Sequence, residues 1–100
     1  MKFNKTSNLK RTEGTSFSGI VLRMDLQQLI DVFGSPSIIG SGDGKTQLTW
    51  IFIKAHKVVT IYDYKEEKNI NNIVNWHVGC KDDLDVIEFL KEKDIEVYVK

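Results

Sequence analysis

Hydrophobic residues recur along this chain in two patterns, one typical of strands and one typical of helices. Runs of β-branched and aromatic residues predict strands, and they are bounded by residues that favour turns. We expect Gly79 to end the fourth run, whereas the charged and polar residues of the last run suit the edge of a sheet. The predicted strands cover residues 16–23, 47–53, 57–64, 73–78 and 95–99.

The first predicted helix begins at Asp25, a residue type that caps helices. Gln28 stands three residues later, as in a capping box, in which each side chain accepts a hydrogen bond from the other residue's backbone N–H. Gly34 and Pro36 then end the helix. One helical face is apolar and should be buried against the sheet; it consists of Leu26, Leu29, Ile30 and Phe33.

The second predicted helix follows Asp82 or Asp83, and acidic residues in its first turn are favourable beside the positive end of the helix dipole. Its apolar stripe consists of Leu84, Ile87 and Leu90 at steps of three, widened by Val86 and Phe89. The same helix carries several acids that could meet a basic partner surface, although a plain solvated face is the alternative. The predicted partner-binding residues are Asp85, Glu88 and Glu92.

The order of elements is β-α-β-β-β-α-β, and its short connections favour a largely antiparallel sheet. The expected fold class is therefore α+β, a two-layer domain with both helices on one face of the sheet. Residues 1–15 are polar and unperiodic, so we expect an irregular N-terminal arm followed by a single domain over residues 16–100. Both faces of the strand at 47–53 are apolar, which predicts a further layer or a partner over the second face.

Composition and charge narrow the function classes. The net charge of zero argues against a dedicated nucleic-acid binder, although residues 1–23 carry five basic residues and one acidic one, while residues 82–96 carry seven acids and two lysines. No apolar run is long enough to span a bilayer, and nothing near the N-terminus is typical of a signal peptide. The single cysteine, Cys80, cannot form an internal disulfide, so a reducing cytosol, and hence a cytoplasmic location, is expected.

The glycine-rich segment 40–46 ends in Gly44, Lys45 and Thr46, as a phosphate-binding P-loop does. The first glycine of that signature would fall on Ile39, and a strand follows where a helix is required. A glycine turn entering a hairpin is thus the favoured interpretation, with a looser anion-binding nest as the alternative.

A polar and aromatic cluster is expected if the hairpin and the strand at 73–78 are neighbours in the sheet. It would offer an aromatic face for a base and cations for a phosphate. Asp63 beside His77 could also orient a general base, but there is no evident nucleophile and two histidines are too few for a zinc site, so we expect neither a cofactor nor a metal. The candidate ligand-binding residues are Lys45, Tyr62, Asp63, Lys65, Trp76 and His77.

Several short motifs together resemble a family of small proteins from phages and large DNA viruses. They are Phe33-Gly34-Ser35-Pro36, Gly42-Asp43-Gly44-Lys45, Trp50, the run Thr60-Ile61-Tyr62-Asp63-Tyr64-Lys65, and Trp76-His77-Val78-Gly79. The resemblance covers roughly residues 12 to 90 and implies a viral origin rather than a reaction.

Three functions follow from these observations. The first is a non-enzymatic viral accessory protein that binds and inhibits a host defence protein, as anti-CRISPR proteins do, for example a defence nuclease with a basic surface. The second is a binder of a small phosphorylated ligand or signalling nucleotide at the cluster. The third is a small hydrolase or transferase that uses Asp63 and His77.

Overall fold

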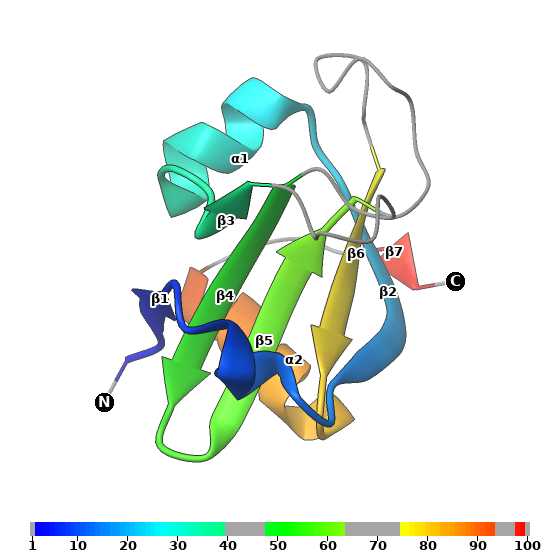
Figure 1. The fold of residues 1–100 in the computed structure, drawn as a ribbon. Coiled ribbons are helices and arrows are strands. Elements are labelled where there is room, and N and C mark those ends of the chain that lie inside the picture. Colours follow the sequence, from blue (N-terminus) through cyan, green and yellow to red (C-terminus); the bar gives the residue numbers. More distant parts are fainter. Residues whose placement is uncertain (1, 40–47, 64–74, 94–97, 100) are drawn as a thin grey trace.

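The computed structural model describes residues 2–39, 48–63, 75–93 and 98–99 (Figure 1). In these ranges a strand and a 3₁₀ helix precede the predicted elements, and one further short strand follows the first predicted helix. The elements are β1 (Asn4–Thr6), η1 (Leu9–Thr12), β2 (Ser16–Arg23), α1 (Leu26–Phe33), β3 (Ile38–Ile39), β4 (Leu48–Lys54), β5 (Lys57–Tyr62), β6 (Asn75–Cys80), α2 (Asp83–Lys93) and β7 (Tyr98–Val99).

The strands form one sheet in the order β1-β4-β5-β6-β2-β7, in which every pairing is antiparallel. The short strand β3 also pairs with β4, so β1 and β3 share the edge of β4 that faces away from β5. The predicted β4–β5 hairpin turns at Ala55, which adopts a left-handed φ of 56°. The expected α+β fold with a largely antiparallel sheet is confirmed, and β7 lies at an edge.

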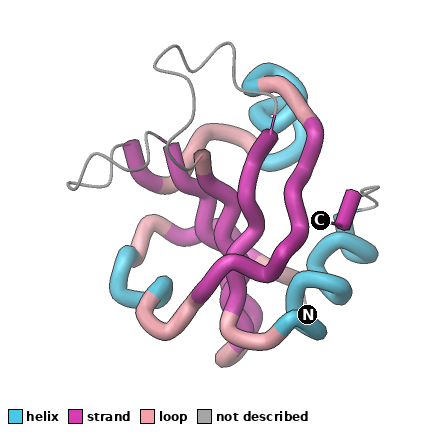
Figure 2. Tube along the Cα trace, turned by 90° about the vertical axis from the view of Figure 1, so that its right-hand side faces the viewer, coloured by secondary structure: helices cyan, strands magenta, loops and turns pink. Residues whose placement is uncertain are grey.

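Both helices pack on one face of the sheet, as predicted. Leu29 and Phe33 of α1 and Phe89 of α2 belong to the same buried cluster as the inward residues of β4, β5, β6 and β2. The rings of Phe33 and Phe89 stack with centroids 5.8 Å apart, which joins the two helices directly. Figure 2 shows the strands standing between η1 on the left and α2 on the right.

The N-terminal segment is not the irregular arm that was expected, since it contributes β1 and η1. The Phe3 ring is buried against Phe89, with centroids 5.3 Å apart, and its N–H donates to both carboxylate oxygens of Glu92 at 3.0 and 3.1 Å. The Lys5 ammonium donates to the Phe33 and Ser35 carbonyls at the C-terminal end of α1, where a cation is favourable. Contacts with residues far along the chain therefore order a segment that has no periodicity of its own.

The same segment covers part of the second face of the sheet, where a further layer or a partner was predicted. Ile51 and Val58 point to the face opposite the helices and are fully buried. The 3₁₀ helix η1 contacts both β4 and β5, and it lies in front of them in Figure 1 while α2 lies behind. The chain itself thus covers this part of the second face.

The buried side of α2 differs from the predicted stripe. Val86, Phe89 and Leu90 are buried, whereas Leu84 is 69% exposed and Ile87 is 46% exposed. A helix turns about 100° per residue, so residues at steps of three drift by about 60° per step around its axis. The sheet buries only the part of this row that faces it, so Leu90 is buried while Leu84 and Ile87 remain in solvent. In α1, by contrast, Leu29 and Phe33 are buried as predicted, and only Ile30 lies at the exposed margin.

Gly79 does not end β6, because the strand continues to Cys80. Gly79 pairs with Thr60 on one side and Phe17 on the other. A Cβ atom at this position would lie 2.5 Å from Thr60 Oγ1 and 3.2 Å from Tyr62 Cε1. A glycine is therefore required here by the close approach of side chains from β5.

Candidate functional site

The predicted polar cluster is partly assembled by the sheet. Strand β5 pairs with β6, so that Tyr62 lies directly opposite His77. Their rings stack with centroids 5.7 Å apart and planes 21° apart, on the face of the sheet that does not carry the helices. The adjacency on which the cluster depended is confirmed. Lys45 and Lys65 lie outside the described residues.

Trp76 lies on the other face and does not join Tyr62 and His77. Its side chain is fully buried and packs edge to face on Trp50, with ring centroids 5.4 Å apart. Its indole N–H donates to the Met24 carbonyl at 2.9 Å. Successive residues of a strand point to opposite faces, so adjacent Trp76 and His77 were never able to share a site.

Asp63 closes the end of the β4–β5 hairpin. Its carboxylate is buried, with 1% of the residue exposed, and accepts a hydrogen bond from the Leu48 N–H at 2.9 Å. This bond satisfies a backbone donor at the first residue of β4. The observed contact is structural, and it places the Asp63 carboxylate away from solvent.

Glu88, one of the three predicted partner-binding acids, is engaged within the fold. Its carboxylate accepts hydrogen bonds from the ammonium groups of Lys54 and Lys57, at the two ends of the hairpin turn. These two cations lower the pKa of Glu88 to about 2, and Glu88 in turn raises the pKa of Lys57. The contact fastens the middle of α2 to the β4–β5 hairpin.

Glu92 is also engaged, because its carboxylate receives the Phe3 N–H and lies 3.6 Å from the Lys93 ammonium. Asp85 is half-buried at the rim of α2, where burial first and then repulsion by Asp82 raise the pKa of its carboxyl. The structure therefore assigns internal contacts to two of the three predicted partner-binding residues.

The first turns of α2 present a different surface from the one predicted, which we call the α2 entry surface. Leu84 and Ile87 are its exposed apolar residues, and acids flank them. Asp82 caps the helix by accepting a hydrogen bond from the Leu84 N–H at 2.9 Å. The spacing of Leu84 and Ile87 predicts core positions for both, so the sequence pattern did not indicate this surface. The α2 entry surface consists of Asp82, Asp83, Leu84, Asp85 and Ile87.

Cys80 is held in the thiol form beneath this surface. Burial, together with a 3.5 Å contact from its Sγ to the Asp83 carboxylate, raises its pKa to about 12. A thiol with so high a pKa is a poor nucleophile at neutral pH. Within the described parts of the chain, no His, Cys, Asp and Glu side chains gather in a group that could hold a metal ion, and no helix is long and apolar enough to cross a membrane.

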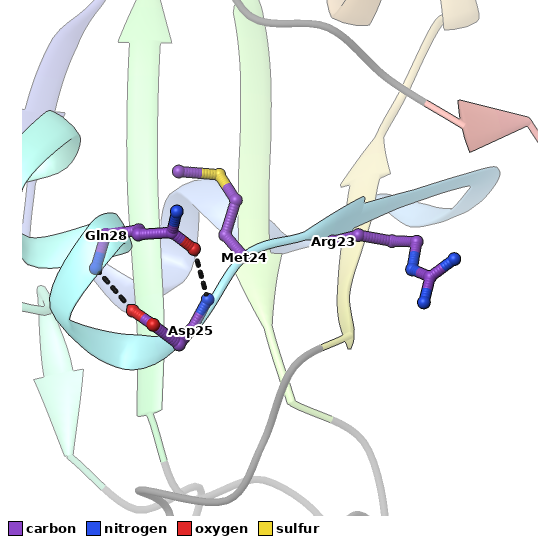
Figure 3. Close-up of a pocket in the computed structure, with 4 residues that line it drawn as sticks. All are labelled: Arg23, Met24, Asp25 and Gln28. Atoms are coloured by element: carbon purple, nitrogen blue, oxygen red, sulfur yellow. Dashed lines mark hydrogen bonds between the residues drawn. The ribbon is translucent and has the colours of Figure 1, made fainter.

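A shallow pocket of about 220 Å³ lies where β2 passes into α1, and Arg23, Met24, Asp25 and Gln28 line it (Figure 3). The predicted capping box occupies one side. Asp25 accepts from the Gln28 N–H at 2.8 Å, and Gln28 Oε1 accepts from the Asp25 N–H at 2.9 Å. The Arg23 side chain extends away from this pair. The Asp25 carboxylate already partly neutralises the positive end of α1.

Comparison with known proteins adds no family to this description. The chain matches no protein-family model, no curated protein and no solved structure.

Proposed function

We propose that this chain is a non-enzymatic binding protein that docks through the α2 entry surface onto a partner protein. The observation that carries the proposal is the exposure of Leu84 and Ile87 on the first turns of a helix whose other apolar residues are buried. An amphipathic helix that shows a second apolar strip to solvent is suited to fill a groove on another protein.

The charges around this strip define the partner's chemistry. Asp82, Asp83 and Asp85 all belong to the α2 entry surface, and none of them forms a salt bridge among the described residues. A partner groove that is apolar at its centre and basic at its rim would match both features. Basic grooves are common in proteins that handle nucleic acids.

Because the chain resembles phage and large DNA virus proteins, we propose that the partner is a protein of the host cell. A defence nuclease of the host cell would present such a basic groove, and occupation of the groove would inhibit it. The alternative catalytic use of Asp63 with His77 has weaker support, because the Asp63 carboxylate is buried and holds the Leu48 N–H.

The test compares two double variants for the proteins they capture from host-cell lysate, measured by quantitative mass spectrometry. Leu84→Ser with Ile87→Ser should lose the captured partner. Ile30→Ser with Val32→Ser is the matched control, because these residues are also partly exposed but lie on α1. Capture by the wild-type chain should weaken as salt rises, since the acids contribute to it. Equal capture by both double variants, or no capture above an unrelated acidic protein, would overturn the proposal.

A further inference from the structure

The face of the sheet opposite the helices carries three rings on three neighbouring strands. Phe17 of β2 lies against His77 of β6, with ring centroids 4.8 Å apart, and His77 stacks on Tyr62 of β5. Phe17 is 44% exposed, while Tyr62 and His77 are half-buried. Phe17 was not among the candidate ligand-binding residues, because its place beside His77 depends on how β2 pairs with β6, and that register shifts between Phe17 and Ile20.

Gly79 makes room for this row of rings. It lies between Phe17 and Thr60 in the sheet, and Tyr62 Cε1 lies 3.2 Å from the point that a Cβ atom of Gly79 would occupy. The Tyr62 ring therefore leans across β6 and lies low over the strand. With no side chain at Gly79, the three rings lie in a row across β5, β6 and β2, and Phe17 is the most exposed of them.

Basic residues lie toward both ends of β2, the strand that carries Phe17, although exposed Glu13 also stands just before this strand. Arg23 lies two residues beyond Val21, the residue paired with His77, so its side chain emerges on the same face. At the other end, exposed Lys10 belongs to η1, and the stem of Lys81 lies beside the turn that joins η1 to β2. The helix α2, which has acidic residues in its first turn, lies on the opposite side of the sheet (Figure 2).

We propose that this aromatic and basic face binds single-stranded nucleic acid. Bases would stack on Phe17 and the adjoining rings, and phosphates would lie against Arg23, Lys10 and Lys81. Basic residues interleaved with aromatic rings are the features by which proteins hold single strands, and sheets with helices on one face use the other face in this way. The site is separate from the α2 entry surface, so this inference does not depend on the proposed function.

The rings predict a preference for single strands, and the number of phosphate contacts predicts the salt dependence of binding. Duplex bases are stacked on each other, so the rings should favour a single strand over a duplex of the same length. Three phosphate contacts predict that log K falls with log salt concentration with a slope of about −2.

The experiment is fluorescence anisotropy with labelled oligo(dT) and oligo(U) of about ten nucleotides, a length within the usual site size. Phe17→Ala should weaken binding by about fivefold or more, which corresponds to the loss of one stacked base. Arg23→Gln should make the salt slope shallower by about 0.7. The matched control is Val32→Ala, which is 46% exposed on α1 and should bind as wild type.

Phe17→Leu separates stacking from packing, because it keeps an apolar contact with His77 and loses the aromatic ring. It should bind as weakly as Phe17→Ala while unfolding at a denaturant concentration close to that of the wild type. The inference is overturned if neither oligonucleotide raises the anisotropy at low salt, if duplex binds as well as single strand, or if Phe17→Leu binds as wild type. Equal affinity for a free mononucleotide would also overturn it, because the site would then hold a small ligand rather than a strand.

Discussion

Replacing Phe3 with alanine tests whether the N-terminal segment is an integral part of the fold. Phe3 is 3% exposed, packs edge to face on Phe89, and has the Lys54 ammonium 5.7 Å above its ring. Truncation of a buried Phe to Ala costs about 3–5 kcal/mol, because apolar contacts are lost and a cavity remains. An irregular arm would predict almost no change in the free energy of unfolding.

Urea unfolding followed by tryptophan fluorescence measures this loss, since Trp50 and Trp76 are both fully buried. The unfolding free energy of a small protein changes by about 1–3 kcal/mol per molar urea, so the midpoint should fall by roughly 2 M. Phe17→Ala removes the same ring from a half-exposed site and should cost about 1 kcal/mol.

The comparison between the two phenylalanines decides the outcome. Equal midpoints for Phe3→Ala and Phe17→Ala would refute the assignment of Phe3 to the core. If Phe3→Ala is unfolded without urea, Phe3→Leu replaces it as the test variant, because leucine keeps most of the apolar contact. Its urea midpoint should lie below that of the wild type and close to that of Phe17→Ala.

Three further predictions follow from named contacts. Because the pKa of Glu88 is lowered, its ion pairs stabilise the fold fully above the ordinary Glu pKa of about 4.3, and this stabilisation is lost as the pH falls toward about 2. In Glu88→Gln, the free energy of unfolding should therefore depend less on pH in this range. Glu92→Gln should destabilise by about 1–3 kcal/mol, because it removes the charge that holds the Phe3 N–H, and unchanged unfolding would contradict that role. Gly79→Ala should cost about 1–3 kcal/mol by collision with Thr60 Oγ1, and adding Thr60→Ala should recover part of the loss in a double-mutant cycle; strictly additive losses would argue against the collision.

Local patterns in the sequence were enough to predict α1 and the β4–β5 hairpin. The capping box joins residues only three positions apart, and the hairpin strands are separated by a two-residue turn, so neighbouring residues decide both structures. The separation of Trp76 from His77 was also available from the sequence, because adjacent strand residues point to opposite faces.

Other features depend on residues that lie far apart in the sequence. Glu92 and Phe3 are 89 residues apart, and Glu88 is 34 and 31 residues from its two lysine partners. An acidic residue on a helix looks the same in the sequence whether its partner is another molecule or the chain's own N-terminal segment. The internal roles of Glu88 and Glu92 therefore emerge only when the sheet brings these segments together.

Periodicity and capping between near neighbours were enough to predict both helices, the longer strands, their antiparallel pairing and the buried face of α1, but not β1, η1 or β3. The tertiary structure alone decided which side of α2 is buried, how the N-terminal segment covers Ile51 and Val58, and how Phe17 joins His77 and Tyr62. A short polar segment gains its order from the surface on which it packs, and a bulge redirects the side chains of its strand. Both effects arise from contacts that form only in the folded chain.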